Sequence, residues 1–300
     1  DEGQLERKAD IFYKRTIKPH TPVTSVDTAS EALAVSMGEK ARVDMDYMCD
    51  LTGKTEEEIF ADLKGVIFLN PMHGYGNSTQ AKYLMADEYL SGNVREKLVL
   101  ARKSVELYPE DYTVNVEALE RVQPKDLTAS EIAVRLGATW LPTEIVEQFM
   151  FEFLGTPRYA QWNIKVHFSA YTGEWNIEGK SYDRSNVKAY STYGTGRINA
   201  YKIIEETLNL KDVRIFDYVE DADGKKKAVL NKKETAIAQA KQELIKQGFQ
   251  DWVWSDPERR ERLCRLYNDK FNSLRPREYD GSHIVFSGMN PEIELREHQR

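Results

Sequence analysis

The sequence predicts a predominantly helical α+β protein. It contains two small winged-helix-like helical units, then a β-hairpin-containing unit and a C-terminal helical hairpin. Three observations predict this fold class. Helical segments with N-capping residues dominate the first half of the 300 residues. Alternating apolar and polar residues, interrupted by glycine turns, follow between residues 162 and 230. Two long helical segments come last, and Asp256-Pro257 opens the second of them.

The first unit is expected over residues 1–80 and begins with a short charged helix at 3–15 and a proline-containing loop. Asp27 or Ser30 is expected to cap a helix that runs to Met37. A helix, a break at Gly53 and a second helix follow. Thr55 is expected to cap this second helix, because three glutamates occupy its first turn, where the helix dipole favours carboxylates. A strand at 66–69 ends the unit.

The second unit is expected over residues 81–157. Helical segments are predicted at 86–90, 93–107 and 113–121. A helix-turn-helix pair is then expected, because a capping signature lies at 127–131 and Pro142 precedes a helix from Thr143 to Phe153. That second helix carries three glutamates and no Lys or Arg, so it is a poor candidate for entering a DNA groove.

A mixed, β-rich unit is expected over residues 158–232. Its first hairpin turns at Tyr171-Thr172-Gly173, and a second hairpin turns at Asp223-Gly224, with a helix at 197–209 between them. The last unit, 233–300, is a helical hairpin with a linker. Gly248 is expected to end its first helix, and the second helix runs from Pro257 to Phe271.

The charge distribution predicts which part of the chain contacts nucleic acid. The net charge of −7 argues against a uniformly basic surface. Residues 1–150 hold 17 Lys/Arg against 26 Asp/Glu, a net of −9, whereas residues 158–202 hold 7 against 3, a net of +4. Cations neutralise phosphates and aromatic rings stack on unpaired bases. The candidate DNA-binding residues are therefore Arg158, Lys165, Lys180, Arg184, Lys188, Tyr193, Arg197 and Lys202.

The alternative interpretation of this stretch is a β-rich domain with its aromatic rings in the core and its cations solvated. We favour that alternative for most of the rings. For the glycine loop Tyr193-Gly194-Thr195-Gly196-Arg197, phosphate contact and a purely structural role are equally good interpretations.

No catalytic, metal or cofactor site is predicted. Gly53-Lys54-Thr55 imitates the end of a phosphate loop, but Met48 stands where that motif needs its first glycine. The five histidines are scattered, and the two cysteines, Cys49 and Cys264, have no ligand at metal spacing. No apolar run approaches the ~18 residues of a membrane helix. We expect a cytoplasmic protein with no membrane partner.

Three segments resemble a family of very large phage and conjugative-element proteins. The segments are Tyr89–Leu98, Leu136–Pro142 and Phe271–Gly281. That family fuses an adenine-specific DNA methyltransferase to a Swi/Snf-type superfamily-two helicase and includes antirestriction proteins. In addition, residues 294–300 resemble the Leu-Arg-x-x-Gln segment at the entry of such a helicase motor. The chain is thus expected to be a piece of a larger enzyme, from the region that connects its two activities.

The resemblance implies DNA as the partner of the whole protein, with flanking methyltransferase and helicase domains in the same chain. It implies ATP with Mg²⁺ and S-adenosylmethionine as cofactors of those domains, and no cofactor in this segment. The expected function is a non-catalytic connector that positions DNA or couples the methylase to the motor. The alternative is a scaffold that contacts only protein.

Overall fold

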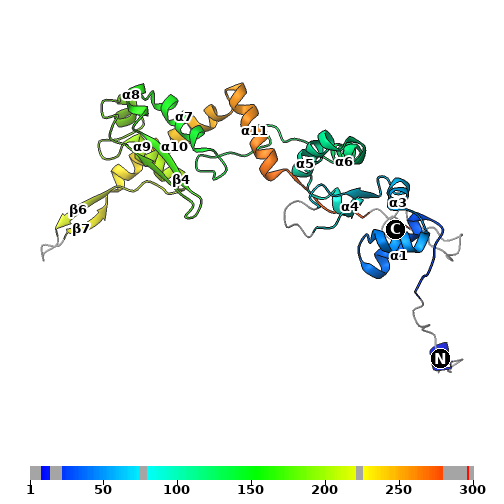
Figure 1. The fold of residues 1–300 in the computed structure, drawn as a ribbon. Helices are drawn as coiled ribbons and strands as arrows, with labels where there is room; N and C mark the ends of the chain where they lie inside the picture. Colours follow the sequence, from blue (N-terminus) through cyan, green and yellow to red (C-terminus); the bar gives the residue numbers. More distant parts are fainter. Residues whose placement is uncertain (1–7, 14–21, 74–79, 221–225, 280–295, 297–300) are drawn as a thin grey trace. The chain divides into compact units, whose positions relative to one another are not determined.

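The computed structural model describes residues 8–13, 22–73, 80–220, 226–279 and 296. The chain forms two compact units: unit 1 comprises residues 1–124 and 273–300, and unit 2 comprises residues 125–272. Figure 1 draws the chain as a ribbon and labels some of its helices and strands. Throughout the described ranges, every sheet is a two-stranded antiparallel ladder.

Unit 1 is mainly helical. Its elements, in chain order, are η1 (Asp10–Phe12), α1 (Ala29–Lys40), α2 (Met45–Thr52), α3 (Glu56–Asp62), β1 (Ile67–Leu69), β2 (Tyr83–Met85), α4 (Ala86–Tyr89), β3 (Gly92–Asn93), α5 (Val94–Leu107), α6 (Pro109–Arg121) and β8 (Leu274–Arg275).

The helix-turn-helix expected around Gly53 is confirmed. Helix α2 ends at Gly53, whose φ of +67° is a left-handed conformation that glycine adopts without strain. The Thr55 side chain then accepts a hydrogen bond from the Glu58 amide, and the Glu58 carboxylate accepts one from the Thr55 amide. Helix α1 is instead capped by Thr28 and not by Asp27 or Ser30, because Thr28 forms the same reciprocal pair with Glu31.

Replacing the cap of α3 should weaken unit 1. We expect Thr55→Ala to lower the free energy of unfolding by about 1 kcal/mol, because the Glu58 amide loses its acceptor. Thr113→Ala, which removes a threonine from inside α6, should cost less than half as much, since alanine is the better helix former there. Urea unfolding followed by circular dichroism measures both, and equal losses would contradict the capping role.

Strand β1 joins the two hydrophobic cores of unit 1. Successive side chains of a strand point to opposite faces. Ile67 accordingly packs with α1, α2 and α3, while Phe68 packs with α5 and α6 and stacks on Tyr89 at a ring-centroid distance of 5.0 Å. The helix-turn-helix and the α5–α6 pair are therefore built on the two sides of one strand.

Unit 1 is closed by a segment from far along the chain. Strand β8 pairs with β3, the Val94 amide donates to the Ser273 carbonyl at 3.1 Å, and Arg277 forms an ion pair with Asp87 at 2.6 Å. Parts of two segments that carry the family resemblance, 89–98 and 271–281, thus lie side by side. The motor-entry segment at 294–300 lies outside the described residues except for Arg296.

Unit 2 combines helices with two hairpins. Its elements are α7 (Thr143–Leu154), α8 (Arg158–Gln161), β4 (Lys165–Ser169), β5 (Glu174–Glu178), the π-helix η2 (Lys188–Thr192), α9 (Ala200–Leu208), β6 (Phe216–Glu220), β7 (Lys226–Leu230), α10 (Lys232–Val253) and α11 (Pro257–Phe271).

The hairpin expected around Tyr171-Thr172-Gly173 is confirmed as β4–β5. Val166, Trp175 and Ile177 are buried on its inner face and alternate with exposed polar residues, the pattern of a sheet with one face covered. The two arms of the second hairpin pair as β6 and β7, although β6 begins at Phe216, and most of their residues are exposed. The turn expected at Asp223-Gly224 lies outside the described residues.

The prediction of a first helix in the second helix-turn-helix is wrong. Residues 123–142 form no helix, because contacts with later parts of the chain hold this stretch. The Asn268 side chain bonds both the amide and the carbonyl of Leu127 at 2.8 and 2.9 Å, and Gln250 donates to the Val134 carbonyl at 2.6 Å. Helix α7 is therefore a core helix, with five buried apolar residues.

The prediction that a helix ends at Gly248 is also wrong, since α10 continues to Val253. A Cβ atom at Gly248 would lie 2.2 Å from Cε2 of Phe153. The glycine therefore permits the close approach of an aromatic ring from α7, and α11 begins as expected with Asp256 as N-cap.

The fold class is confirmed as α+β and mainly helical, with small hairpins. One hydrophobic core runs through unit 2 from Val134 to Leu263. The unit boundaries expected at 157/158 and 232/233 both fall within this span.

Candidate nucleic-acid interface

Four of the eight candidate DNA-binding residues are paired with carboxylates. Lys165 lies 4.0 Å from Glu147, and Arg197 lies 2.8 Å from Asp217. Lys180 and Lys202 both lie 2.5 Å from the buried carboxylate of Glu205. A phosphate would have to compete with these carboxylates, so these four cations contribute less to an anion site than the sequence suggests.

The glycine loop uses its own polar groups. The Thr195 hydroxyl accepts from the amides of Arg197 and Ile198 at 3.1 and 3.2 Å, and the Thr195 amide donates to the Ile198 carbonyl. The Tyr193 ring packs on Phe153 with centroids 4.3 Å apart. These amides and this half-buried ring are therefore already engaged within unit 2.

The other three candidate cations lie close together. Arg158, Arg184 and Lys188 are all exposed, and within the described ranges no ion pair or hydrogen bond engages their side chains. Arg158 begins α8, while Arg184 and Lys188 lie on the segment that leads into η2. We name residues 154–163 and 179–188 together the α8 corner.

Three contacts hold the two segments of the α8 corner side by side. Gly179 lies so close to Asn163 that a Cβ atom would be 2.0 Å from the Asn163 carbonyl oxygen, and it would also contact the Tyr182 ring. At the other end, the Asn186 side chain donates to the Leu154 carbonyl at 3.0 Å, and the Lys188 side chain lies beside Gly155.

A buried polar network fixes the middle of the corner. The Tyr201 hydroxyl donates to Asp183 at 2.6 Å and contacts the Thr156 hydroxyl at 2.8 Å. Burial, followed by the hydrogen bond to Asp183, raises the pKa of Tyr201 well above its usual value. Asn186 donates to the same carboxylate, so the one anion of the corner is engaged beneath the surface.

Three large aromatic side chains are exposed on the α8 corner. Trp162 is 81% exposed, Tyr159 62% and Tyr182 59%. The sequence interpretation placed most of the rings between 158 and 202 in a core, and that is right for Trp175 and Tyr201, which are buried. Alternation along β5 identifies Trp175 as buried, but no local pattern distinguishes Trp162.

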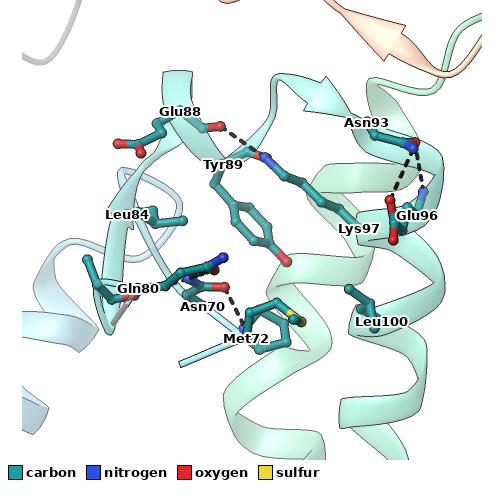
Figure 2. A pocket seen from close by; sticks show the side chains of 12 residues that line it. Asn70, Met72, Gln80, Leu84, Glu88, Tyr89, Asn93, Glu96, Lys97 and Leu100 are labelled. Carbon is teal, nitrogen blue, oxygen red and sulfur yellow. Dashed lines mark hydrogen bonds between the residues drawn. The ribbon is translucent and has the colours of Figure 1, made fainter. Parts of the chain in front are cut away.

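A pocket of about 530 Å³ lies in unit 1, between the β1–β2 hairpin and α5 (Figure 2). Lys97 donates to the carbonyls of Glu88, Tyr89 and Ser91 at 2.8–3.1 Å, and burial lowers its pKa. Burial likewise raises the pKa of Tyr89 to about 12. Among the described residues that line the pocket, the Lys97 ammonium is already engaged by three carbonyls and is therefore not free to act as a base.

The second helix of the helix-turn-helix is acidic. Helix α3 carries Glu56, Glu57, Glu58 and Asp62. Glu56 accepts from Lys82 and from the Tyr83 hydroxyl, both at 2.6 Å, and Asp62 pairs with Lys54 at 2.6 Å. Because phosphate repels carboxylates, this helix is unsuited to entering a DNA groove.

Comparison with protein-family models assigns the first part of unit 1. Residues 25–80, which contain α1, α2, α3 and β1, match the model described as "Probable helicase, winged helix domain". This segment is a helicase-associated winged-helix region. Residues 135–273 match the model of a domain of unknown function (DUF8437), a range close to that of unit 2.

No curated protein and no solved structure matches the chain. Among the residues that the structure describes, no group of three or more His, Cys, Asp or Glu side chains could hold a metal ion. A search of the same residues finds no helix with the length and apolar character needed to cross a bilayer.

Proposed function

We propose that this chain is a non-catalytic accessory region of a DNA helicase and that it binds DNA through the α8 corner of unit 2. The winged-helix match at 25–80 supports the helicase association. The observation that supports DNA binding is the group of three exposed cations, Arg158, Arg184 and Lys188, with which no described carboxylate forms an ion pair. The α8 corner that carries them has four Lys/Arg and one buried Asp.

The resemblance at 89–98, 136–142 and 271–281 supports a more specific proposal. The chain connects an adenine-specific DNA methyltransferase to a Swi/Snf-type motor in a protein of a phage or other mobile element. ATP with Mg²⁺ and S-adenosylmethionine then belong to the flanking domains. The chain's role is to position DNA between the two activities.

A scaffold role is the second candidate, and the acidic α3 favours it for unit 1. A winged helix that cannot approach phosphates through α3 is better suited to contact a protein. The two functions are compatible, since unit 1 and unit 2 have separate cores.

The proposal predicts the salt dependence of DNA binding. Each neutralised phosphate contributes about −0.7 to −0.9 to the slope of log affinity against log salt. We expect the triple variant Arg158→Ala, Arg184→Ala and Lys188→Ala to bind any DNA sequence more weakly and to flatten this slope by about two units. Anisotropy titrations of the 300-residue chain at several salt concentrations measure it.

The control has the same change of net charge elsewhere in unit 2. Lys226→Ala, Lys227→Ala and Lys233→Ala remove three exposed cations near the β6–β7 hairpin. This variant should keep most of the slope of log affinity against log salt. If both triple variants change binding equally, or if the chain binds no DNA at low salt, the α8 corner is not the site and the scaffold function remains.

A further inference from the structure

We infer that the α8 corner takes single-stranded DNA in preference to duplex, with Trp162 as the platform on which an unpaired base stacks. The inference rests on the proposed function and makes it more specific. It depends on the aromatic side chains of the corner, whereas the proposed function depends on its cations.

Trp162 has the geometry of a stacking platform. It is the C-cap of α8 and keeps helical backbone angles, with φ −65° and ψ −28°. Tyr159 precedes it by three residues, so both rings project from neighbouring positions on one side of the helix. These two rings contribute little to the hydrophobic core, because 81% of Trp162 and 62% of Tyr159 stay exposed.

The rings and the cations are arranged for a ligand that has both bases and phosphates. The segment 179–188 adds Tyr182 beside Asn163, the residue that follows Trp162. Arg158 adjoins Tyr159, and Arg184 lies two residues beyond Tyr182. A single strand offers unstacked bases to the rings and phosphates to the cations, whereas the bases of a duplex are stacked on each other and closed to the rings.

The neighbouring helix limits where the strand can run. Glu144, Glu147 and Glu152 of α7 line a groove that reaches Gly155 and Gln161. Glu147 accepts from the Val166 amide and Glu152 from the Trp252 indole, and both Glu144 and Glu152 are exposed to solvent. Repulsion from this groove directs a strand along α8 and the 179–188 segment and away from α7.

The corner is also rigid, which reduces the entropy lost on binding. The buried Tyr201–Asp183 hydrogen bond and the Asn186–Leu154 contact hold the segment that carries Tyr182, Arg184 and Lys188. Tyr182, Arg184 and Lys188 therefore project from a backbone segment that these hydrogen bonds hold in place.

The test compares Trp162→Ala with the unchanged 300-residue chain on a labelled dT 20-mer and on a 20-base-pair duplex. We expect the unchanged chain to prefer the single strand. Trp162→Ala should weaken single-strand binding about 5- to 100-fold and leave duplex binding within about twofold. Trp162→Phe should restore most of the loss, since it keeps a ring. Circular dichroism checks that the variants fold, which we expect because Trp162 is exposed.

Tyr171→Ala is the matched control. Tyr171 is 99% exposed at the β4–β5 turn, away from the corner, so its removal should not change single-strand affinity. Equal losses for Trp162→Ala and Tyr171→Ala, equal losses on single strand and duplex, or tighter binding of an rU 20-mer would overturn the inference. If the triple cation variant flattens the salt slope while Trp162→Ala has no effect, the proposed function stands and this inference fails. Absence of binding to either DNA overturns both.

Discussion

Glu205→Gln is expected to lower the free energy of unfolding by about 2 kcal/mol at neutral pH. The Glu205 carboxylate is buried, accepts the Ile177 amide at 2.8 Å and pairs with Lys180 and Lys202. Breaking a fully buried pair costs roughly 3–5 kcal/mol, and the partial exposure of both lysines reduces that cost. Urea unfolding monitored by tryptophan fluorescence measures the difference.

The same variant has a pH signature. Burial raises the pKa of Glu205, but the hydrogen bonds from Lys180, Lys202 and the Ile177 amide outweigh burial and lower it below the ordinary 4.5. A lowered carboxyl pKa stabilises the fold fully above the unfolded value, and this contribution is lost as pH falls through the folded value. The difference in unfolding free energy between the unchanged chain and Glu205→Gln should therefore be constant near neutral pH and become smaller below pH 4.5.

Glu206→Gln is the control, because Glu206 is less buried and, among the described residues, forms a single ion pair, with Lys202 at 2.9 Å. It should cost less than ~1 kcal/mol. If Glu205→Gln lowers the unfolding free energy by as much at pH 4 as at pH 7, lost packing and not lost charge causes the destabilisation.

Gly179→Ala should destabilise unit 2 by more than ~2 kcal/mol and separate the two segments of the α8 corner. The φ of Gly179 is +70°, a strained conformation for alanine, and the new Cβ would lie 2.0 Å from the Asn163 carbonyl oxygen. The backbone itself must move to relieve that overlap. The loss of thermal stability measures the cost, and single-strand affinity reports on the corner.

Gly173→Ala separates the strain from the overlap. Gly173 has a nearly identical φ of +72°, but no atom lies within 4 Å of a Cβ placed there. It should cost only about 1 kcal/mol, the cost of the backbone conformation. If the two glycine variants lose equal stability, the close approach of Gly179 to Asn163 does not hold the corner together.

Local sequence signals predicted the elements whose causes are local. The Gly53 break, the Thr55 cap, the turn at 171–173 and the Asp256-Pro257 helix start all depend on residues within four positions of each other, and all are confirmed. The cap at Thr28 was missed, although the Thr28–Glu31 spacing carries the same signal as Thr55–Glu58.

Errors arose where distant residues decide the structure. The segment 127–142 begins with a capping signature, yet Asn268 binds Leu127 and Gln250 binds Val134, and the segment is not helical. Gly248 has the identity of a helix terminator, but its role is to admit the Phe153 ring.

The candidate site shows the same limit. Composition identified the basic stretch at 158–202, but composition cannot distinguish a cation beside a carboxylate from one beside water. Arg197 and Asp217 are 20 positions apart in the sequence and Lys180 and Glu205 are 25 apart, so only the fold shows that they pair. Trp162 and Trp175 are the same residue type, and only their neighbours in space separate an exposed ring from a buried one.

Because β8 lies near the C-terminal end of the sequence, it is synthesised after β3 and after all of unit 2. A ribosome completes all of unit 2 before residues 273–275 exist, so β3 must wait for its partner strand. Unit 2 can fold in that interval, and its ends, Lys125 and Asn272, then lie within hydrogen-bonding distance at 2.8 Å. This contact replaces a flexible loop of more than a hundred residues by a short connection, which lowers the entropic cost of bringing β8 to β3. Completion of the β3–β8 pairing in unit 1 is thereby expected to follow the folding of unit 2.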